Sequence, residues 1–159
     1  MKLTLIPLIL FFLFNGQILS AGDLLKGFEA YSSGDYQTAH EEWSSLAESG
    51  DPIAQTSLAI MYQLGQGVQI NHPKAFALLQ NAARKGYVPA QTSLGSFYEK
   101  GVGVPLDNVR AYMWYYIASS SDAVSRTLLE IMKQTVNSDQ INTAMLLAEE
   151  CVNSNFVKC

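Results

Sequence analysis

The sequence predicts an all-α fold, a right-handed superhelical solenoid of about four helix hairpins. Three observations predict it: a segment recurs at an offset of 36 residues, apolar residues within each copy follow helical spacing, and glycines stand where helices would end. The composition suits a globular chain, because the 159 residues are 48% hydrophobic and 15% charged, with 11 Gly and 5 Pro. Disordered, collagen-like and low-complexity chains are thereby excluded.

The amino terminus has the order of a cleavable export signal. Lys2 supplies a positive start, residues 3–14 are an apolar run, and small residues follow up to Ala21. The run is shorter than the roughly 20 apolar residues that a membrane-spanning helix needs. We therefore expect residues 1–21 to be a signal peptide and residues 22–159 to form a single solenoid. The expected location is the bacterial periplasm or the extracellular space, with no stable membrane anchor after cleavage.

The repeat is clearest between residues 50–68 and residues 86–104. These segments share ten identities in nineteen positions without a gap, including the block AQTSL. Flanking positions keep the same offset, so the matches are in phase over about 80 residues, which indicates tandem units. The expected units cover about 22–50, 51–86 and 87–120, followed by a terminal cap at 121–159.

Each repeated unit is expected to contain two helices. The first helix carries one apolar stripe and ends at a glycine, which adopts the left-handed conformation that stops a helix. Its residues in the two copies are Ala54, Leu58, Met61, Tyr62, Gly65 and Ala90, Leu94, Phe97, Tyr98, Gly101. The second helix starts after Asn71 or Asp107, whose side chain can accept a hydrogen bond from a first-turn amide. Its stripes are Ala75, Leu78, Leu79, Ala82 and Ala111, Trp114, Tyr115, Ala118.

These residues resemble the SEL-one-like repeats (SLR), relatives of the tetratricopeptide repeats. The pattern A-x-x-x-L-(G/A)-x-x-Y-x-x-G-x-G-V, followed by (D/N)-x-x-(K/R)-A, matches residues 54–86 and 90–119. Residues 27–51 resemble the degenerate first hairpin of exported members, with residues 34–36 as a shortened turn. Since neither helix of a unit can bury its stripe alone, the resemblance implies a stacked solenoid.

The last unit departs from the period, as terminal repeats often do. Residues 121–135 and 138–151 are still expected to be helical, and Asn137 with Gln140 forms a candidate capping box. The expected core stripes are Val124, Leu128, Ile131 in the first helix and Ile141, Ala144, Leu147, Ala148 in the second.

Cys151 and Cys159 are the two cysteines of the chain. They resemble the pairs that clasp helices in cysteine-rich secreted members of this family, which implies a disulfide; free or intermolecular thiols are the alternatives. Two cysteines without a nearby histidine cannot fill a zinc site, so no metal is expected. No cofactor is expected either.

The sequence favours no catalytic residues. The repeated glycine turns lack the Gly-Lys-Ser/Thr of a phosphate loop, and neither His40 nor His72 has an evident nucleophile beside it. The chain has no Ser-x-x-Lys, and Ser121-Asp122-Ala123 is only an imperfect echo of the β-lactamase Ser-Asp-Asn. With 10 Lys+Arg against 14 Asp+Glu and no basic run, nucleic acid is not an expected partner.

The resemblance implies that the first helices line a concave groove that holds proteins or peptides. Their side chains are mostly uncharged, which suits an extended peptide. By similarity to tetratricopeptide groove positions, the expected groove residues are Ile53, Thr56, Ile60, Gln63, Leu64, Pro89, Thr92, Ser96, Glu99 and Lys100.

We therefore expect an exported, non-catalytic scaffold or adaptor that acts through protein–protein contacts. An accessory factor that binds cell-wall peptidoglycan is the alternative, and a β-lactamase-like hydrolase is a weaker one. The oligomeric state stays open.

Overall fold

The computed structural model describes residues 23–159, which contain helices and loops and no strand. The all-α prediction is confirmed, whereas the expected signal peptide lies outside the described residues. Residues 23–33 form a first helix. It is followed by α2 (Tyr36–Glu48), α3 (Pro52–Leu64), α4 (His72–Arg84), α5 (Val88–Lys100), α6 (Asn108–Ser119), α7 (Ala123–Met132) and α8 (Ser138–Asn153).

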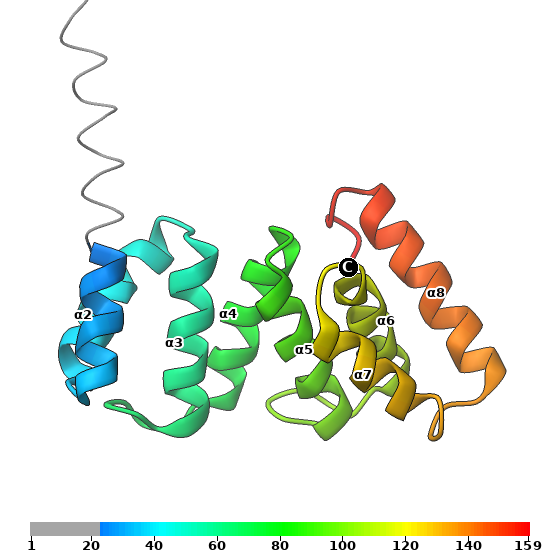
Figure 1. The fold of residues 1–159 in the computed structure, drawn as a ribbon, viewed down its shortest axis with the longest axis horizontal. Coiled ribbons are helices and arrows are strands. Elements are labelled where there is room, and N and C mark those ends of the chain that lie inside the picture. The colour runs from blue at the N-terminus through cyan, green and yellow to red at the C-terminus, as the bar shows by residue number, and fades with distance from the viewer. Residues whose placement is uncertain (1–22) are drawn as a thin grey trace, which may run out of the picture.

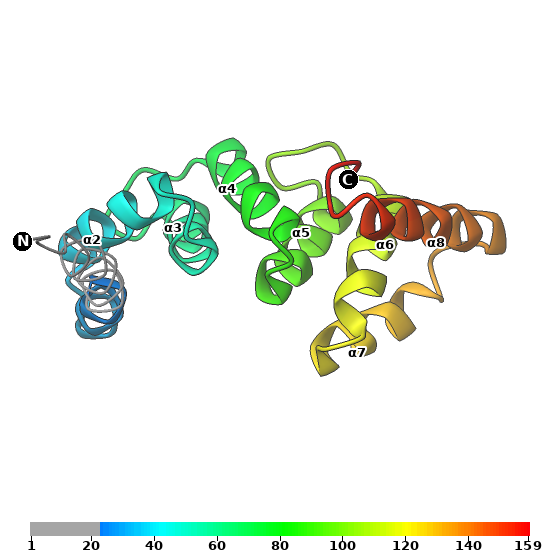
Figure 2. The ribbon, with the colours of Figure 1, turned by 90° about the horizontal axis from the view of Figure 1, so that it is seen from above.

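The helices stack side by side into a curved array (Figure 1). Within the two repeated units α3 packs on α4 and α5 packs on α6, and α4 and α5 join the units. Seen from above, α3, α5 and α7 lie on the inner side of the curve, while α2 and α4 lie on the outer side (Figure 2). The first helices of successive units thus form the concave face.

The core is the set of apolar positions that the 36-residue period predicts. All eight stripe residues of α3 and α5 are buried, and of the eight in α4 and α6 only Leu78 is partly exposed. The same register extends to α2, where Ala39 and Trp43 are buried at 0% and 1% exposure. Burial of a large apolar side chain stabilises by about 1.5–3 kcal/mol, so this shared core holds the units together.

The glycine turns are structural. Gly65 and Gly101 end α3 and α5 in the left-handed region, with φ of 72° and 65°. A Cβ on Gly103 would lie 2.5 Å from the backbone of His72, because the turn of one unit rests on the start of the second helix of the preceding unit. The expected caps are confirmed as well, since Asn71 accepts a hydrogen bond from the Lys74 amide at 3.0 Å.

A buried glutamine ties each unit to the one before it. The side-chain amides of Gln55 and Gln91 donate to the carbonyl oxygens of Ala47 and Ala83, at 3.1 and 3.2 Å. These carbonyls belong to the last turn of the preceding helix, where each also accepts a backbone hydrogen bond from the glycine that follows, Gly50 or Gly86, at 3.0 Å. The glutamine of the repeated AQTSL block therefore links its unit to the preceding one in the stack.

The terminal unit corrects one prediction. In α7 the buried residues are Ser125, Leu129 and Met132, whereas the expected core residues Val124 and Ile131 are 59% and 52% exposed. Relative to the prediction, α7 is rotated about its axis, because Ser125 faces α5 and its hydroxyl lies 2.7 Å from that of Thr92.

The second helix of the terminal unit follows its predicted pattern. Ala144 and Ala148 are buried, Ile141 and Leu147 are half-buried, and the capping box of Asn137 and Gln140 is present. However, α8 packs against α6 and has at most marginal contact with α7. The last two helices therefore do not close into a hairpin.

Candidate interaction surface

The ten residues predicted to face the groove lie on α3 and α5 and differ in accessibility. Thr56 is buried at 7% exposure. Ile53, Gln63, Thr92, Ser96 and Glu99 are half-buried. The exposed members are Ile60, Leu64, Pro89 and Lys100.

The two threonines of this set have partners within the protein. The hydroxyl of Thr56 donates to the carbonyl of Pro52 in its own helix, at 2.7 Å. The hydroxyl of Thr92 lies within hydrogen-bond distance of the Asp122 carboxylate, at 3.2 Å, as well as of Ser125. The apolar members Ile60, Leu64 and Pro89 thus offer more free surface than the threonines do.

A shallow pocket of about 260 Å³ lies between the amino-terminal ends of α5 and α7. Its lining consists of Val88, Pro89, Thr92, Ser93, Asp122 and Val124. Sequence reasoning found Pro89 and Thr92, but it placed Val124 in the core and missed its exposed position. The apolar spacing of α7 allows either of two faces to be buried, and this explains the error.

Asp122 gives this pocket a negative charge. Burial alone would raise the pKa of its carboxyl group, but hydrogen bonds from the Ser125 side chain and amide, the Val124 amide and Thr92 lower that pKa below its usual value. The carboxylate caps α7, accepting from the Ser125 amide at 2.8 Å. It acts as a structural cap and stays ionised near neutral pH.

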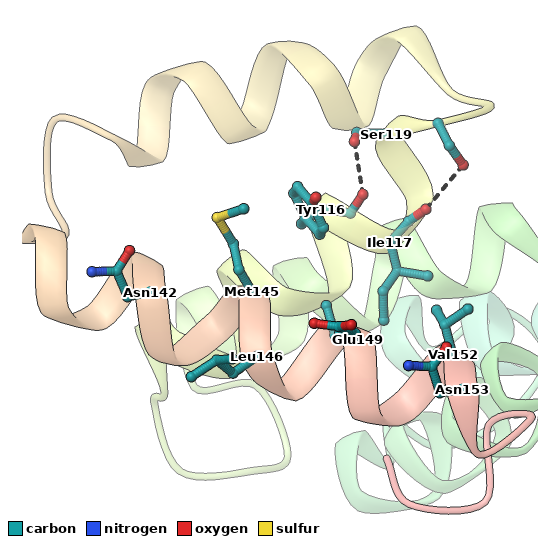
Figure 3. A pocket seen from close by; sticks show the side chains of 11 residues that line it. Tyr116, Ile117, Ser119, Asn142, Met145, Leu146, Glu149, Val152 and Asn153 are labelled. Atoms are coloured by element: carbon teal, nitrogen blue, oxygen red, sulfur yellow. Dashed lines mark hydrogen bonds between the residues drawn. The ribbon is translucent and has the colours of Figure 1, made fainter.

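A larger pocket, of about 830 Å³, lies between α6 and α8 at the carboxy-terminal end of the solenoid (Figure 3). We call it the terminal groove. Its apolar lining is Tyr116, Ile117, Met145, Leu146, Ala148 and Val152. Its polar lining is Ser119, Ser120, Asn142, Glu149 and Asn153.

Sequence reasoning missed the terminal groove, although a signal for it exists. Residues 144–148 are all apolar, so α8 carries apolar side chains outside its core stripe. Ala144 and Ala148 face the core, while Met145 and Leu146 are 40% and 67% exposed. A helix that is apolar on two faces requires a second partner or leaves one face in water.

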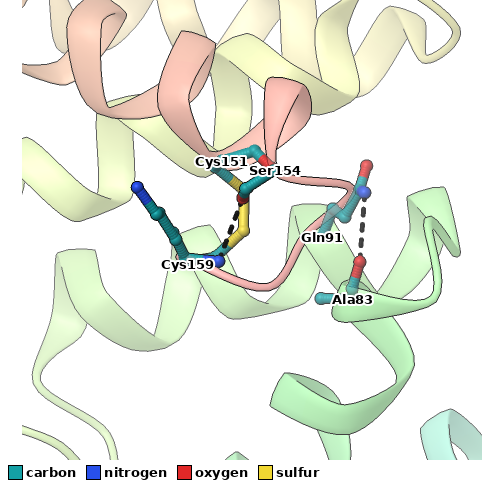
Figure 4. The surroundings of a disulfide bond; sticks show 6 residues. Ala83, Gln91, Cys151, Ser154 and Cys159 are labelled. Atoms are coloured by element: carbon teal, nitrogen blue, oxygen red, sulfur yellow. Dashed lines mark hydrogen bonds between the residues drawn. A yellow bond between two sulfur atoms is a disulfide. The ribbon is translucent and has the colours of Figure 1, made fainter.

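The carboxy-terminal tail folds back beside this end of the molecule. Cys151, which is fully buried, is joined by a disulfide to Cys159 (Figure 4). Within the closed loop the Lys158 amide donates to the Ser154 hydroxyl at 3.0 Å. Phe156 lies against Gly86 in the turn between α4 and α5. The tail thus connects the last helix to a unit 70 residues earlier in the chain.

One cluster of titratable groups joins α2, α3 and α4. The Tyr62 hydroxyl accepts a hydrogen bond from Lys74 at 2.7 Å and lies 3.0 Å from Nε2 of His40. Burial first, and Lys74 second, lower the pKa of His40 below its ordinary value. None of these residues lines either of the two pockets described above.

Residues 23–159 contain no group of three or more His, Cys, Asp and Glu side chains that could hold a metal ion. None of the helices in that range combines the length and hydropathy that crossing a bilayer requires.

Comparison with known proteins identifies the type of repeat. Residues 52–87 and 88–122 match the Sel1 repeat. A segment of 55 residues is 38% identical to an uncharacterised protein of Neisseria meningitidis serogroup B, over 35% of this chain and 12% of that protein.

Two crystal structures have a similar fold. One is a protective antigen present in uropathogenic Escherichia coli strains and displaying an SLR fold, with a TM-score of 0.79 and 24% identity over 87% of this chain and 32% of that one. The other is a Sel1 repeat protein from Oxalobacter formigenes, with a TM-score of 0.64 and 31% identity over 67% of this chain and 44% of that one. The chain thus spans less than half the length of each of these relatives.

Proposed function

Because this chain contains two Sel1 repeats and folds as an SLR solenoid, we propose that it is an exported, non-catalytic scaffold that binds a protein or peptide on its concave face. Sel1 repeat proteins typically mediate protein–protein contacts, which supports this class of function. The concave face is defined here by the exposed residues Ile60, Leu64, Pro89, Lys100 and Val124 of α3, α5 and α7.

The pocket between α5 and α7 is the observation that carries the proposal. At about 260 Å³ it is smaller than the sites that usually enclose whole small molecules, so it suits one side chain of a larger partner. Pro89 and Val124 supply apolar walls for that side chain. Ser93 and the ionised Asp122 supply acceptors for backbone amides of an extended segment.

The disulfide and the amino-terminal sequence support export. Disulfides persist in oxidising compartments and are rare in the cytosol. The chain also begins with the charge, apolar run and small residues of a secretory signal. The periplasm and the extracellular space both satisfy these conditions.

Site-specific photocrosslinking tests the proposal. A photoreactive amino acid replaces Val124, which is exposed in the pocket, and in a control it replaces Asn81, which is exposed on α4. Envelope and host fractions are then offered to the purified proteins. We expect a protein adduct from the Val124 probe alone, and Ile60→Glu should reduce its yield.

Three outcomes would contradict the proposal. Equal adducts from both probes would place the partner elsewhere, and retention only on isolated peptidoglycan would indicate a cell-wall ligand. Turnover of a chromogenic β-lactam above the buffer rate would indicate an enzyme.

A further inference from the structure

The terminal groove is an exposed apolar surface that the concave face does not include. Leu146 and Val152 on its rim are 67% and 49% exposed, and Tyr116 at its floor is 40% exposed. Figure 3 shows the side chains of Tyr116 and Met145 in the space between α7 and α8. Apolar side chains gathered in one groove, rather than scattered singly, mark an interaction site.

The path of the last helices explains why this groove exists. In the two repeated units the second helix packs against the first helix of its own unit, as α4 does on α3 and α6 on α5. In the terminal unit α8 packs on α6 instead, so α7 and α8 separate. No segment between residues 23 and 159 fills the resulting space beside α6.

The shape of the lining fits a helix. Along α8 the lining residues fall at positions 142, 145, 146, 148, 149, 152 and 153, which is one continuous helical face. At a rise of 1.5 Å per residue this face is about 16 Å long, or three turns. An amphipathic helix packs its own apolar face into such a groove through residues at the same spacing.

The charge of the lining restricts the partner. Glu149 is the one ionisable acid or base among the lining residues apart from the Tyr116 phenol, and no Lys or Arg lines the groove. Within residues 23–159 Glu149 takes part in no ion pair, whereas its neighbour Glu150 is paired with Lys158 at 3.0 Å. A basic residue on the partner is therefore favoured and an acidic one is repelled.

The same charge disfavours a second copy of this chain. The opposite end of the solenoid exposes Leu25 and Phe28, at 63% and 41%, on the helix of residues 23–33. That helix also carries Asp23 and Glu29, and its Lys26 is already ion-paired with Glu42. Stacking it into the terminal groove would bring carboxylates towards Glu149.

We propose that the terminal groove binds an amphipathic helix of another protein, with apolar residues at helical spacing and a Lys or Arg opposite Glu149. The concave face could then hold a second partner at the same time, which makes the solenoid a two-site adaptor. This proposal does not depend on the concave-face proposal, because the two surfaces share no lining residue.

Two synthetic helical peptides of about 15 residues test it. Both carry the same Leu and Ala face, and one is flanked by Lys where the other has Glu. Methionine-methyl NMR of the purified protein reports the position of binding, because Met145 lines the groove while Met61 and Met132 are buried elsewhere. The Lys peptide should shift the Met145 signal and leave that of Met61 unchanged.

Fluorescence anisotropy with matched variants measures the energetics. Leu146→Asp should weaken binding of the Lys peptide by about tenfold or more, the effect of losing one buried Leu contact. Leu106→Asp is the control, since Leu106 is 62% exposed in the turn before α6 and lies outside the groove. Glu149→Lys should remove or reverse the preference for the Lys peptide.

The proposal is overturned if Met145 does not shift at millimolar peptide, or if the Lys and Glu peptides bind equally. It is also overturned if the protein self-associates and Leu146→Asp abolishes that self-association, because the groove would then serve a second copy. The concave-face variant Ile60→Glu should leave peptide binding unchanged, so failure here and failure of the proposed function are separate results.

Discussion

The interface between the first two units has His40 where the next interface has Phe76. The rings of Tyr62 and Tyr98 are each covered edge-on, by His40 at a centroid distance of 5.8 Å and by Phe76 at 5.4 Å. Only His40 adds a polar contact, through the Tyr62 hydroxyl that also accepts from Lys74. The interface between the first two units therefore contains a group that can gain a proton, where the next interface has a hydrocarbon ring.

This difference predicts a pH-dependent stability. The pKa of His40 in the folded protein lies below its ordinary value of 6.5, because burial and Lys74 disfavour the charged ring. As the pH falls, His40 therefore gains its proton at a higher pH in the unfolded chain than in the folded protein. The free energy of unfolding consequently decreases as the pH is lowered below 6.5. Urea unfolding at about pH 7.5 and about pH 5 should show this loss.

His40→Phe, which copies the residue at position 76, is the matched variant. It removes the titrating ring and retains the edge-on packing, so it should weaken the pH dependence. An unchanged difference between the two pH values would assign the effect to other groups.

A second residue-scale prediction concerns Gly95, which faces the ring of Tyr115. A Cβ there would lie 2.6 Å from Cε1 of Tyr115. Helix propensity alone would make Gly95→Ala stabilising by about 1 kcal/mol, whereas overpacking costs about 1–3 kcal/mol. We expect overpacking to dominate because Tyr115 is fully buried, so its ring has little room to move.

The preceding repeat supplies the compensating change. It has Ala59 and Leu79 at the positions equivalent to Gly95 and Tyr115. Chemical denaturation should therefore show that Gly95→Ala costs less in a Tyr115→Leu background than in the wild type. Additive effects of the two substitutions would contradict this packing argument.

At the level of elements, the units are joined by contacts that the period repeats and by contacts that occur once. The glutamine side chains that bond Ala47 and Ala83 are periodic. In the terminal unit Arg126 takes over this role and donates to the carbonyl of Ser119 at 2.8 Å. The tail with its disulfide has no counterpart in the other units within residues 23–159.

Opening the disulfide is predicted to loosen the tail. Closing so short a loop stabilises by about 2–3 kcal/mol in the chain-entropy model. Cys159→Ser should lower the unfolding temperature and speed hydrogen exchange in residues 152–159 and in the turn at Gly86, which Phe156 contacts. Cys159 is chosen because Cys151 is fully buried and its replacement would also disturb the core.

Phe156→Ala separates the two contributions. It removes the contact with Gly86 and keeps the disulfide, so exchange should increase at the turn more than within the closed loop. If Cys159→Ser left both regions as protected as in the wild type, the tail would be held by packing alone.

On the scale of the whole molecule, the solenoid has two ends and two candidate surfaces. Its first helix follows directly after the expected signal peptide, and its last helix borders the terminal groove. In a linear stack the first and last units have a neighbour on one side only, so within residues 23–159 the outer faces of these two units are not covered by another unit. Both ends indeed expose large apolar side chains, at Leu25 and at Leu146.

Export makes a prediction about residues 1–21. If residues 1–21 are a signal peptide, the protein recovered from the periplasm or the medium should begin at Gly22. Intact mass and amino-terminal sequencing measure this directly. Replacing the apolar residues Leu8 and Leu10 by Arg should keep the uncleaved chain in the cytoplasm, and recovery of a full-length chain outside the cytoplasm would refute cleavage.

The sequence was sufficient to predict the repeated part of the fold because each structural role occurs at equivalent positions in both repeats. Core positions such as Leu58 and Leu94 are buried alike, and Gly65 and Gly101 end their helices alike. A period constrains many positions together, so hydrophobic spacing and turn residues support one another. The groove candidates, of which Ile60, Leu64, Pro89 and Lys100 are exposed, came instead from the resemblance to tetratricopeptide groove positions and stay predictions.

The tertiary structure alone decided which face of α7 is buried, how α8 packs and which surfaces these helices leave free. In α7 and α8 apolar residues occupy more than one face, and spacing along the chain does not say which face finds a partner. The pair of Thr92 and Ser125, 33 residues apart, turns α7, and packing of α8 on α6 opens the terminal groove. Local periodicity thus determined the repeats, whereas contacts between residues far apart in the sequence determined how α7 and α8 pack.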